Sequence, residues 1–203
     1  MAKIQSRGIG KPALWAATLA PLITSGGYVI AGASWPGYDP IAKAISDLAA
    51  DDSPVQLYVS MLFLVGAASD IIVSHYAKAF ALPGRVAILL GAVATIGLTV
   101  FTTPSQTSSS TGHRVFAVAS FLIFTIWPLL AMRRGKDAPP MLRPLTSIIG
   151  TVFLAAISIW FLTLWVDPNA QIMGLSERIV VIVQAIYPAF VLWHSYLWLR
   201  KQK

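Results

Sequence analysis

Six polar residues near the ends of long apolar stretches have side chains that could bind a ligand or carry out a reaction. They are Ser46, Asp47, His113, Arg114, Glu177 and Arg178. A guanidinium group can donate two parallel hydrogen bonds to a phosphate or a carboxylate. Arg114 and Arg178 could therefore hold a lipid headgroup or the acidic end of another hydrophobic ligand.

The same charges could instead form ion pairs that lock helix ends together. In that interpretation Asp47 faces Arg114 or Arg178, and Glu177 faces His113. An arginine near lipid usually has an acidic partner, because an unpaired charge at that depth is costly. The residue types alone do not decide between pairing and ligand binding.

A third interpretation is a membrane-embedded lipid hydrolase. Ser46 would be the nucleophile, His113 the general base and Glu177 the group that orients the base. Ser46 lies in a helical Ile-Ser-Asp-Leu pattern, without the strained turn that presents a nucleophilic serine. Catalytic residues therefore cannot be assigned, and whether the chain is an enzyme stays open.

A second group of ionisable residues, Asp70, His75 and His194, lies toward the opposite ends of two apolar stretches. These residue types can bind zinc. However, Asp70 and His75 are five residues apart, about 140° around a helix, and do not share a face. No metal site and no cofactor is therefore favoured. Asp70 could instead hydrogen-bond to Ser74 or relay protons in a transporter.

Composition shows what kind of element must carry these residues. The chain has 203 residues, of which 56% are hydrophobic and 11% charged, and it has no cysteine. Soluble domains carry about 25% charged residues. The mean hydropathy of +0.70 also indicates a protein whose outer surface faces lipid. The net charge of +7 does not indicate nucleic-acid binding, because the basic residues form no contiguous face.

Six apolar stretches are each long enough to span a membrane as a helix, for which about 20 residues suffice. They cover residues 12–33, 55–77, 84–102, 115–132, 145–166 and 179–199. The runs are solidly apolar, whereas barrel strands would alternate. The sequence therefore predicts an all-α polytopic membrane protein in which residues 1–203 form one six-helix domain.

The basic residues predict how the six helices are oriented. Twelve of the fifteen Lys and Arg residues lie in segments that an even number of spans places on one side. Cytoplasmic segments carry such an excess. We therefore expect a multi-pass protein of the cell (inner) membrane with both termini cytoplasmic. Lys43, Arg114 and Arg178 are the three exceptions.

A short external helix is expected between the first two spans. Asp39 and Pro40 are suited to the N-cap and first position of a helix. The spacing of Ile41, Ala44, Ile45 and Leu48 would give that helix one apolar face.

Three external motifs resemble those of a known family. Tyr38-Asp39-Pro40 precedes Ile45-Ser46-Asp47-Leu48, Pro104 precedes Gly112-His113, and Gly174-Leu175-Ser176-Glu177-Arg178 opens the last span. In this order the motifs resemble a mostly prokaryotic group of six-span membrane proteins, classed as a domain of unknown function (number nine-nine-eight). Ser105 follows Pro104 where that pattern has an Asp. The resemblance implies the six-span fold and no established activity.

The sequence therefore predicts an integral membrane protein that binds a lipid or hydrophobic ligand in a polar pocket at its extracytoplasmic end. The pocket would contain the six residues named first. A lipid hydrolase and a non-catalytic subunit or transporter are the alternatives. Membrane lipid is the expected partner, together with a protein partner or a second copy within the membrane.

Overall fold

The computed structural model describes residues 8–108 and 110–202 and confirms the all-α, six-span prediction. The six long helices are α2 (Lys11–Ala33), α4 (Gln56–Tyr76), α5 (Leu82–Val100), α6 (Thr111–Leu130), α7 (Pro144–Trp165) and α8 (Met173–Lys201). A one-turn helix, α3 (Ile45–Leu48), lies between α2 and α4, and a 3-10 turn, η1 (Pro140–Leu142), precedes α7. Each long helix is long and apolar enough to cross a membrane.

Two helices begin well before the apolar stretches that predicted them. α6 begins at Thr111 where the stretch begins at 115, and α8 begins at Met173 where the stretch begins at 179. Ser110 caps α6, because its side-chain oxygen accepts a hydrogen bond from the His113 amide at 3.1 Å. The first turns of both helices are polar, so hydropathy alone places them outside the spans.

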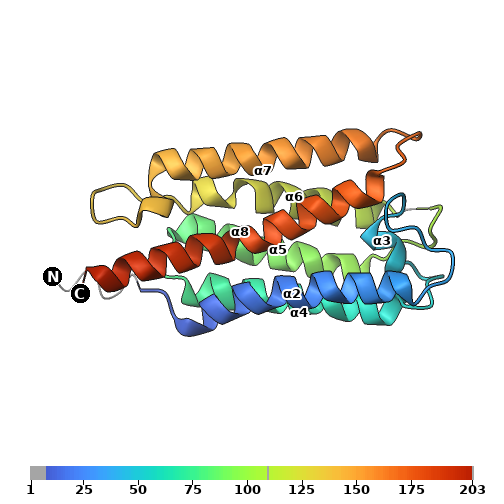
Figure 1. Ribbon diagram of the computed structural model, residues 1–203, viewed down its shortest axis with the longest axis horizontal. Helices are drawn as coiled ribbons and strands as arrows, with labels where there is room; N and C mark the ends of the chain where they lie inside the picture. Colours follow the sequence, from blue (N-terminus) through green and yellow to red (C-terminus); the bar gives the residue numbers. More distant parts are fainter. Residues whose placement is uncertain (1–7, 109, 203) are drawn as a thin grey trace.

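The long helices form a ring in chain order. Each packs against the next one along the chain, and α8 closes the ring by packing against α2. The helices alternate in direction, so the start of α2 and the end of α8 lie at one end of the bundle, which we call the terminal end (Figure 1). The α3 helix lies at the opposite end, the α3 end. The cytoplasmic location of the terminal end stays a prediction.

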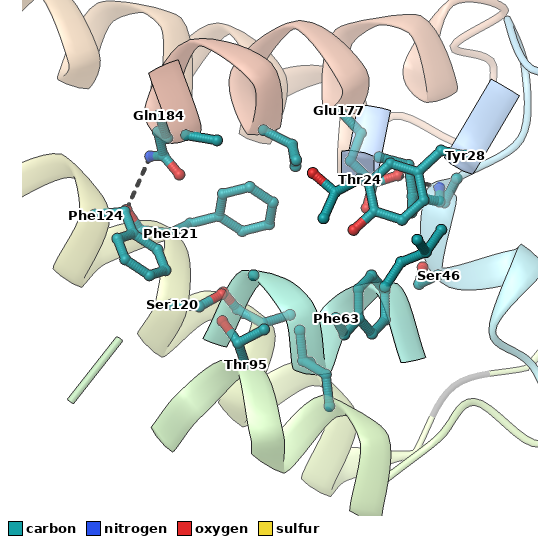
Figure 2. Close-up of a pocket in the computed structure, with 18 of the residues that line it drawn as sticks. Thr24, Tyr28, Ser46, Phe63, Thr95, Ser120, Phe121, Phe124, Glu177 and Gln184 are labelled. Atoms are coloured by element: carbon teal, nitrogen blue, oxygen red, sulfur yellow. Dashed lines mark hydrogen bonds between the residues drawn. The ribbon is translucent and has the colours of Figure 1, made fainter. Parts of the chain in front are cut away.

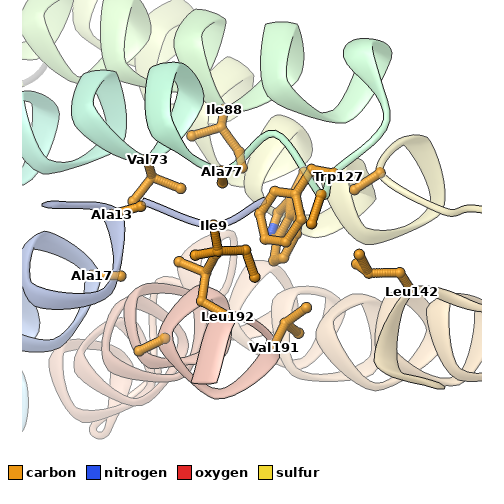
Figure 3. Packing of buried hydrophobic residues seen from close by; sticks show 14 of the residues in the cluster. Ile9, Ala13, Ala17, Val73, Ala77, Ile88, Trp127, Leu142, Val191 and Leu192 are labelled. Carbon is orange, nitrogen blue, oxygen red and sulfur yellow. The ribbon is translucent and has the colours of Figure 1, made fainter. Parts of the chain in front are cut away.

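The terminal half of the ring is filled by a tightly packed apolar core (Figure 3). Trp127 and Phe80 are its largest fully buried side chains, with ring centroids 5.3 Å apart. Leu142 of η1 and Leu192 of α8 pack into the same cluster. This end of the bundle is therefore closed by side chains from five of the six long helices and from η1.

The segment between α2 and α4 corrects the prediction for the short helix. Asp39 does not start it: its carboxylate accepts a hydrogen bond from the Ile41 amide at 2.9 Å and holds a turn. The helix begins only after Ala44, whose amide donates to the Asp47 carboxylate at 2.9 Å. Ile45 and Leu48 are buried as the apolar face required, but Ile41 is 50% exposed. Asp39 satisfies its own turn, and this local bond competes with helix initiation.

Candidate functional site

A cavity of about 390 Å³ lies inside the ring at the α3 end. All six long helices contribute to its wall, and α3 and residues 103–108 cover its outer part. Figure 2 shows Tyr28, Ser46 and Glu177 together near the α3 end. Gln184 and Phe124 lie at the other end of the same view. Cavities that bind small ligands usually have volumes of about 300–1,000 Å³.

Five of the six residues that the sequence singled out line this cavity. They are Ser46, Asp47, His113, Arg114 and Glu177. They come from α3, from the first turn of α6 and from the first turns of α8. The structure therefore gathers residues from three distant parts of the chain at one end of one cavity.

Arg178 is the exception, because it does not belong to the cavity wall. Its guanidinium donates to the carbonyl oxygens of Lys43 at 2.9 Å and Gly174 at 2.8 Å, and to the Tyr38 hydroxyl at 2.5 Å. It also lies over the Tyr38 ring, 5.6 Å from the centroid. Arg178 thus anchors the α2–α4 connection to α8, and it does not line the cavity together with Arg114.

The neighbouring residues of α8 hold the same connection. The Leu175 amide donates to the Ile41 carbonyl at 2.9 Å, and the Glu177 carboxylate accepts from the Ile45 amide at 2.5 Å. A Cβ atom added to Gly174 would lie only 2.0 Å from the Lys43 carbonyl oxygen. The Gly-Leu-x-Glu-Arg motif is therefore a clamp for the segment that covers the cavity.

The tyrosine at the centre of this clamp stays protonated. Burial raises the pKa of Tyr38 to about 12, although the adjacent Arg178 guanidinium opposes this shift. The phenol donates to the Ala44 carbonyl at 2.6 Å while it accepts from Arg178. Its hydroxyl therefore links α8 to the backbone just before α3.

The two acids of the cavity wall at this end, Asp47 and Glu177, accept hydrogen bonds from backbone amides. Glu177 is buried and accepts from Ile45, and Asp47 accepts from Ala44. Burial raises the pKa of Asp47 above its ordinary value, partly opposed by that amide, Lys43 and Arg178. No hydrogen bond in the described part of the chain joins either acid to His113, Arg114 or Arg178. The expected ion pairs are therefore replaced by bonds to the backbone.

His113 is buried at the first turn of α6, and its ring is held by the end of α5. Its Nδ1 lies 2.9 Å from the Phe101 carbonyl oxygen. A carbonyl only accepts, so Nδ1 carries the proton and Nε2 is left as the acceptor of the neutral ring. Among the described residues, no hydrogen bond connects His113 with Ser46 or Glu177. The three residues do not form the relay that a serine hydrolase uses.

Four phenylalanines also line the cavity, among polar residues that include Ser120 and Gln184. Phe63, Phe121, Phe124 and Phe161 line it, with the rings of Phe121 and Phe161 4.9 Å apart. Gly66 lies on the same wall, and nothing stands within 4 Å of a Cβ added there. This part of the cavity suits an apolar chain or ring.

Asp70 lines the cavity as well, which sequence reasoning did not foresee. Leu62, Gly66, Ser69 and Val73 are among the other residues of the same helix that line the cavity. They recur at intervals of three and four residues, the spacing of one helix face. That spacing is a signal that could have placed Asp70 on an inward face.

The histidines grouped with Asp70 in the sequence lie elsewhere. His75 and His194 are exposed, and the His194 ring rests on Phe190 with centroids 4.2 Å apart. Over the described residues, no group of three metal-binding side chains is close enough to hold one ion.

The fold and this cavity define a class: a polytopic membrane protein whose six helices surround an internal cavity covered by a clamped connection. A family model matches residues 18–194, and the chain belongs to that family, described as protein of unknown function (DUF998). This confirms the family that the three motifs indicated. No curated protein and no solved structure matches the chain.

Proposed function

We propose that this protein binds a lipid or another hydrophobic ligand in the cavity at the α3 end. The observation that carries the proposal is an internal cavity of about 390 Å³ lined by all six spans. The side chains that line it lack van der Waals partners on one side wherever the cavity is empty, because protein interiors are otherwise close-packed. A ligand that fills it would supply those partners.

The distribution of polar groups suits an amphiphile. Ser46, Asp47 and Arg114 lie at the α3 end, and the phenylalanines follow deeper in the bundle. Arg114 is exposed at the cavity wall, where it can meet an anionic or polar group. An apolar body would then lie among the aromatic side chains.

A cavity-filling substitution tests the proposal. Gly66→Leu adds a side chain on the cavity wall, at a position where no atom lies within 4 Å of the first added carbon. Gly26→Leu is the matched control, since Gly26 is also open but is exposed outside the cavity wall. Native mass spectrometry of protein purified from membranes would measure the retained lipid or other small molecule.

We expect wild type and Gly66→Leu to differ, with the retained molecule lost from Gly66→Leu and kept by Gly26→Leu. Equal occupancy in all three proteins, or no retained molecule in any of them, would count against a ligand in the cavity.

We also propose that the terminal end faces the cytoplasm of a cell whose inner membrane holds the protein. Because the chain has no cysteine, single cysteines can report the side. Lys136→Cys lies in the α6–α7 connection and Asn169→Cys in the α7–α8 connection, and both positions are exposed. A membrane-impermeant maleimide should label only Asn169→Cys in intact cells; labelling of only Lys136→Cys would reverse the orientation.

A further inference from the structure

The floor of the cavity is deep inside the bundle. Pro21, Asp70, Phe124 and Pro188 line it from four helices. Each lies 12 to 15 residues from the end of its helix at the α3 end, roughly 18–22 Å at 1.5 Å per residue. Asp70 therefore sits at a depth where a bilayer supplies no water to a carboxylate.

Asp70 differs from the other two acids of the cavity wall. Asp47 and Glu177 each accept a hydrogen bond from a backbone amide. No group in the described part of the chain donates one to the Asp70 carboxylate, which faces the cavity. An ionisable group at this depth usually pairs with another group or marks a ligand pathway.

Three of the hydroxyl groups that line the cavity already donate within their own helices, whereas those of Tyr28 and Ser69 make no hydrogen bond among the described residues. Thr24 donates its proton to the Ala20 carbonyl at 2.9 Å. Thr95 donates to the Gly91 carbonyl at 3.1 Å, and Ser120 to its own helix at 2.8 Å. Each of these three hydroxyls has one proton to donate, so only its oxygen lone pairs remain for a ligand.

Two prolines leave further acceptors at the same depth. Proline has no amide hydrogen, so Pro21 cannot serve the carbonyl of Ala17, four residues earlier. Pro188 likewise cannot serve the carbonyl of Gln184. Ala17 and Gln184 both belong to the cavity wall. The carbonyl oxygens of both residues therefore lack the backbone amide donor that an α-helix ordinarily supplies.

The Gln184 side chain adds one more acceptor. Its amide nitrogen donates to the Phe121 carbonyl oxygen at 3.2 Å and to the hydroxyl oxygens of Thr125 and Ser158, each at 3.1 Å. Figure 2 shows the bond to Phe121, with the amide oxygen on the opposite side of the group. The part of Gln184 that is left for a ligand is therefore its oxygen.

The protein places no basic side chain beside these acceptors. Among the described residues of the wall, Arg114 is the only Lys or Arg, and it lies in the first turn of α6. Phe124 is ten residues further along that helix, roughly 15 Å away at 1.5 Å per residue. A positive charge at the floor must therefore come from a bound molecule.

We propose that the floor of the cavity binds a protonated amine carried on an apolar body, with its ammonium group at Asp70. This rests on the proposed function and names the chemical class of its ligand. The ammonium donates to the carboxylate and to neighbouring oxygens, while the phenylalanine faces favour a nearby positive charge. The volume of about 390 Å³ and the aromatic wall fit an alkyl or aryl amine, whereas a bare metal ion would prefer a full shell of oxygens.

Dodecylammonium and dodecanol, which share one alkyl chain, test this assignment. Their equilibrium binding would be measured on protein in phosphatidylcholine nanodiscs, with empty nanodiscs subtracted. We expect wild type to prefer the amine by about tenfold or more, the ratio that a charge-assisted hydrogen bond supplies. Asp70→Asn should lose this preference and keep dodecanol binding, while the exposed Asp137→Asn should behave as wild type.

The outcomes separate the two proposals. Equal binding of amine and alcohol by wild type would overturn the amine assignment and leave the hydrophobic-ligand proposal intact, whatever the variants do. Binding of neither probe by wild type, with no effect of Gly66→Leu, would remove both. A preference that survives Asp70→Asn would also overturn the role of Asp70.

Adding phosphatidylethanolamine to the nanodiscs identifies the source of the amine. Competition by this lipid against dodecylammonium would indicate an amine-bearing membrane lipid. Binding of dodecylammonium without that competition would indicate a small organic cation that enters from elsewhere.

Discussion

The two halves of the bundle are built from the same helices but filled in different ways. Toward the terminal end, Trp127 and Phe80 occupy the centre of the ring, and Leu142 of η1 packs beside them. Toward the α3 end, a cavity occupies the centre and a connecting segment covers it. The covering segment is fixed mainly by hydrogen bonds between its backbone and the start of α8, including the Glu177 and Arg178 side chains. The terminal half is thus filled by its apolar core, whereas the α3 half combines a smaller apolar cluster around Leu48 and Val59 with polar bonds beside a cavity.

The largest difference should appear when an aromatic residue is truncated in each half. Trp127→Ala would empty a fully buried site, and we expect it to lower the free energy of unfolding by about 3 kcal/mol or more. Phe121→Ala on the cavity wall should cost clearly less, because that side chain already borders empty space. Thermal unfolding in the same detergent compares the two. Equal losses would mean that the cavity half is packed as tightly as the terminal half.

The clamp at the α3 end can be tested with one added methyl group. Gly174→Ala would press its Cβ against the Lys43 backbone carbonyl, and we expect a loss of about 2 kcal/mol from this overpacking. Gly66→Ala is the control, because it adds the same group where nothing lies within 4 Å. Thermal unfolding should separate the two variants by several degrees. If Gly174→Ala is as stable as Gly66→Ala, the close approach of α8 to the covering segment is not needed.

Arg114 and Arg178, both candidate ligand-binding residues in the sequence, should contribute differently to stability. Arg178→Lys would lose the planar fork that joins two carbonyls and Tyr38, and should cost about 1–2 kcal/mol of stability. Arg114→Lys, at an exposed position, should leave the unfolding midpoint nearly unchanged. The opposite ranking would show that Arg114, and not Arg178, secures the α3 end.

The smallest effect concerns the pH dependence of the cavity half. Burial raises the pKa of Asp47 in the folded protein, so the folded state holds its proton up to a higher pH than the unfolded chain. Stability should therefore fall as pH rises from the ordinary Asp pKa to the raised one, and then level off. Asp47→Asn should flatten that part of the stability–pH curve while keeping an acceptor for the Ala44 amide. An unchanged slope would mean that other groups produce it.

Much of the architecture could be predicted because it depends on local composition. The apolar runs around residues 145–166 and 55–77 coincide with α7 and α4 to within one residue at each end. The starts of α6 and α8 were predicted too late, since their first turns are polar. Asp39 followed by Pro40 predicts the start of the short helix, but the Asp39 carboxylate holds a turn instead, and the residue types do not reveal that competition.

The sequence by itself determined the spans, their even number and the family, because each follows from composition and motif order along the chain. Only the tertiary structure decided which polar residues face the cavity. Glu177 and Arg178 are adjacent in the sequence, but successive residues point about 100° apart around a helix. Glu177 therefore lines the cavity, while Arg178 donates hydrogen bonds to the covering segment. Asp70 lines the cavity because it lies on the inward face of α4. A closed ring brings the inward faces of its helices together, whatever their separation along the chain.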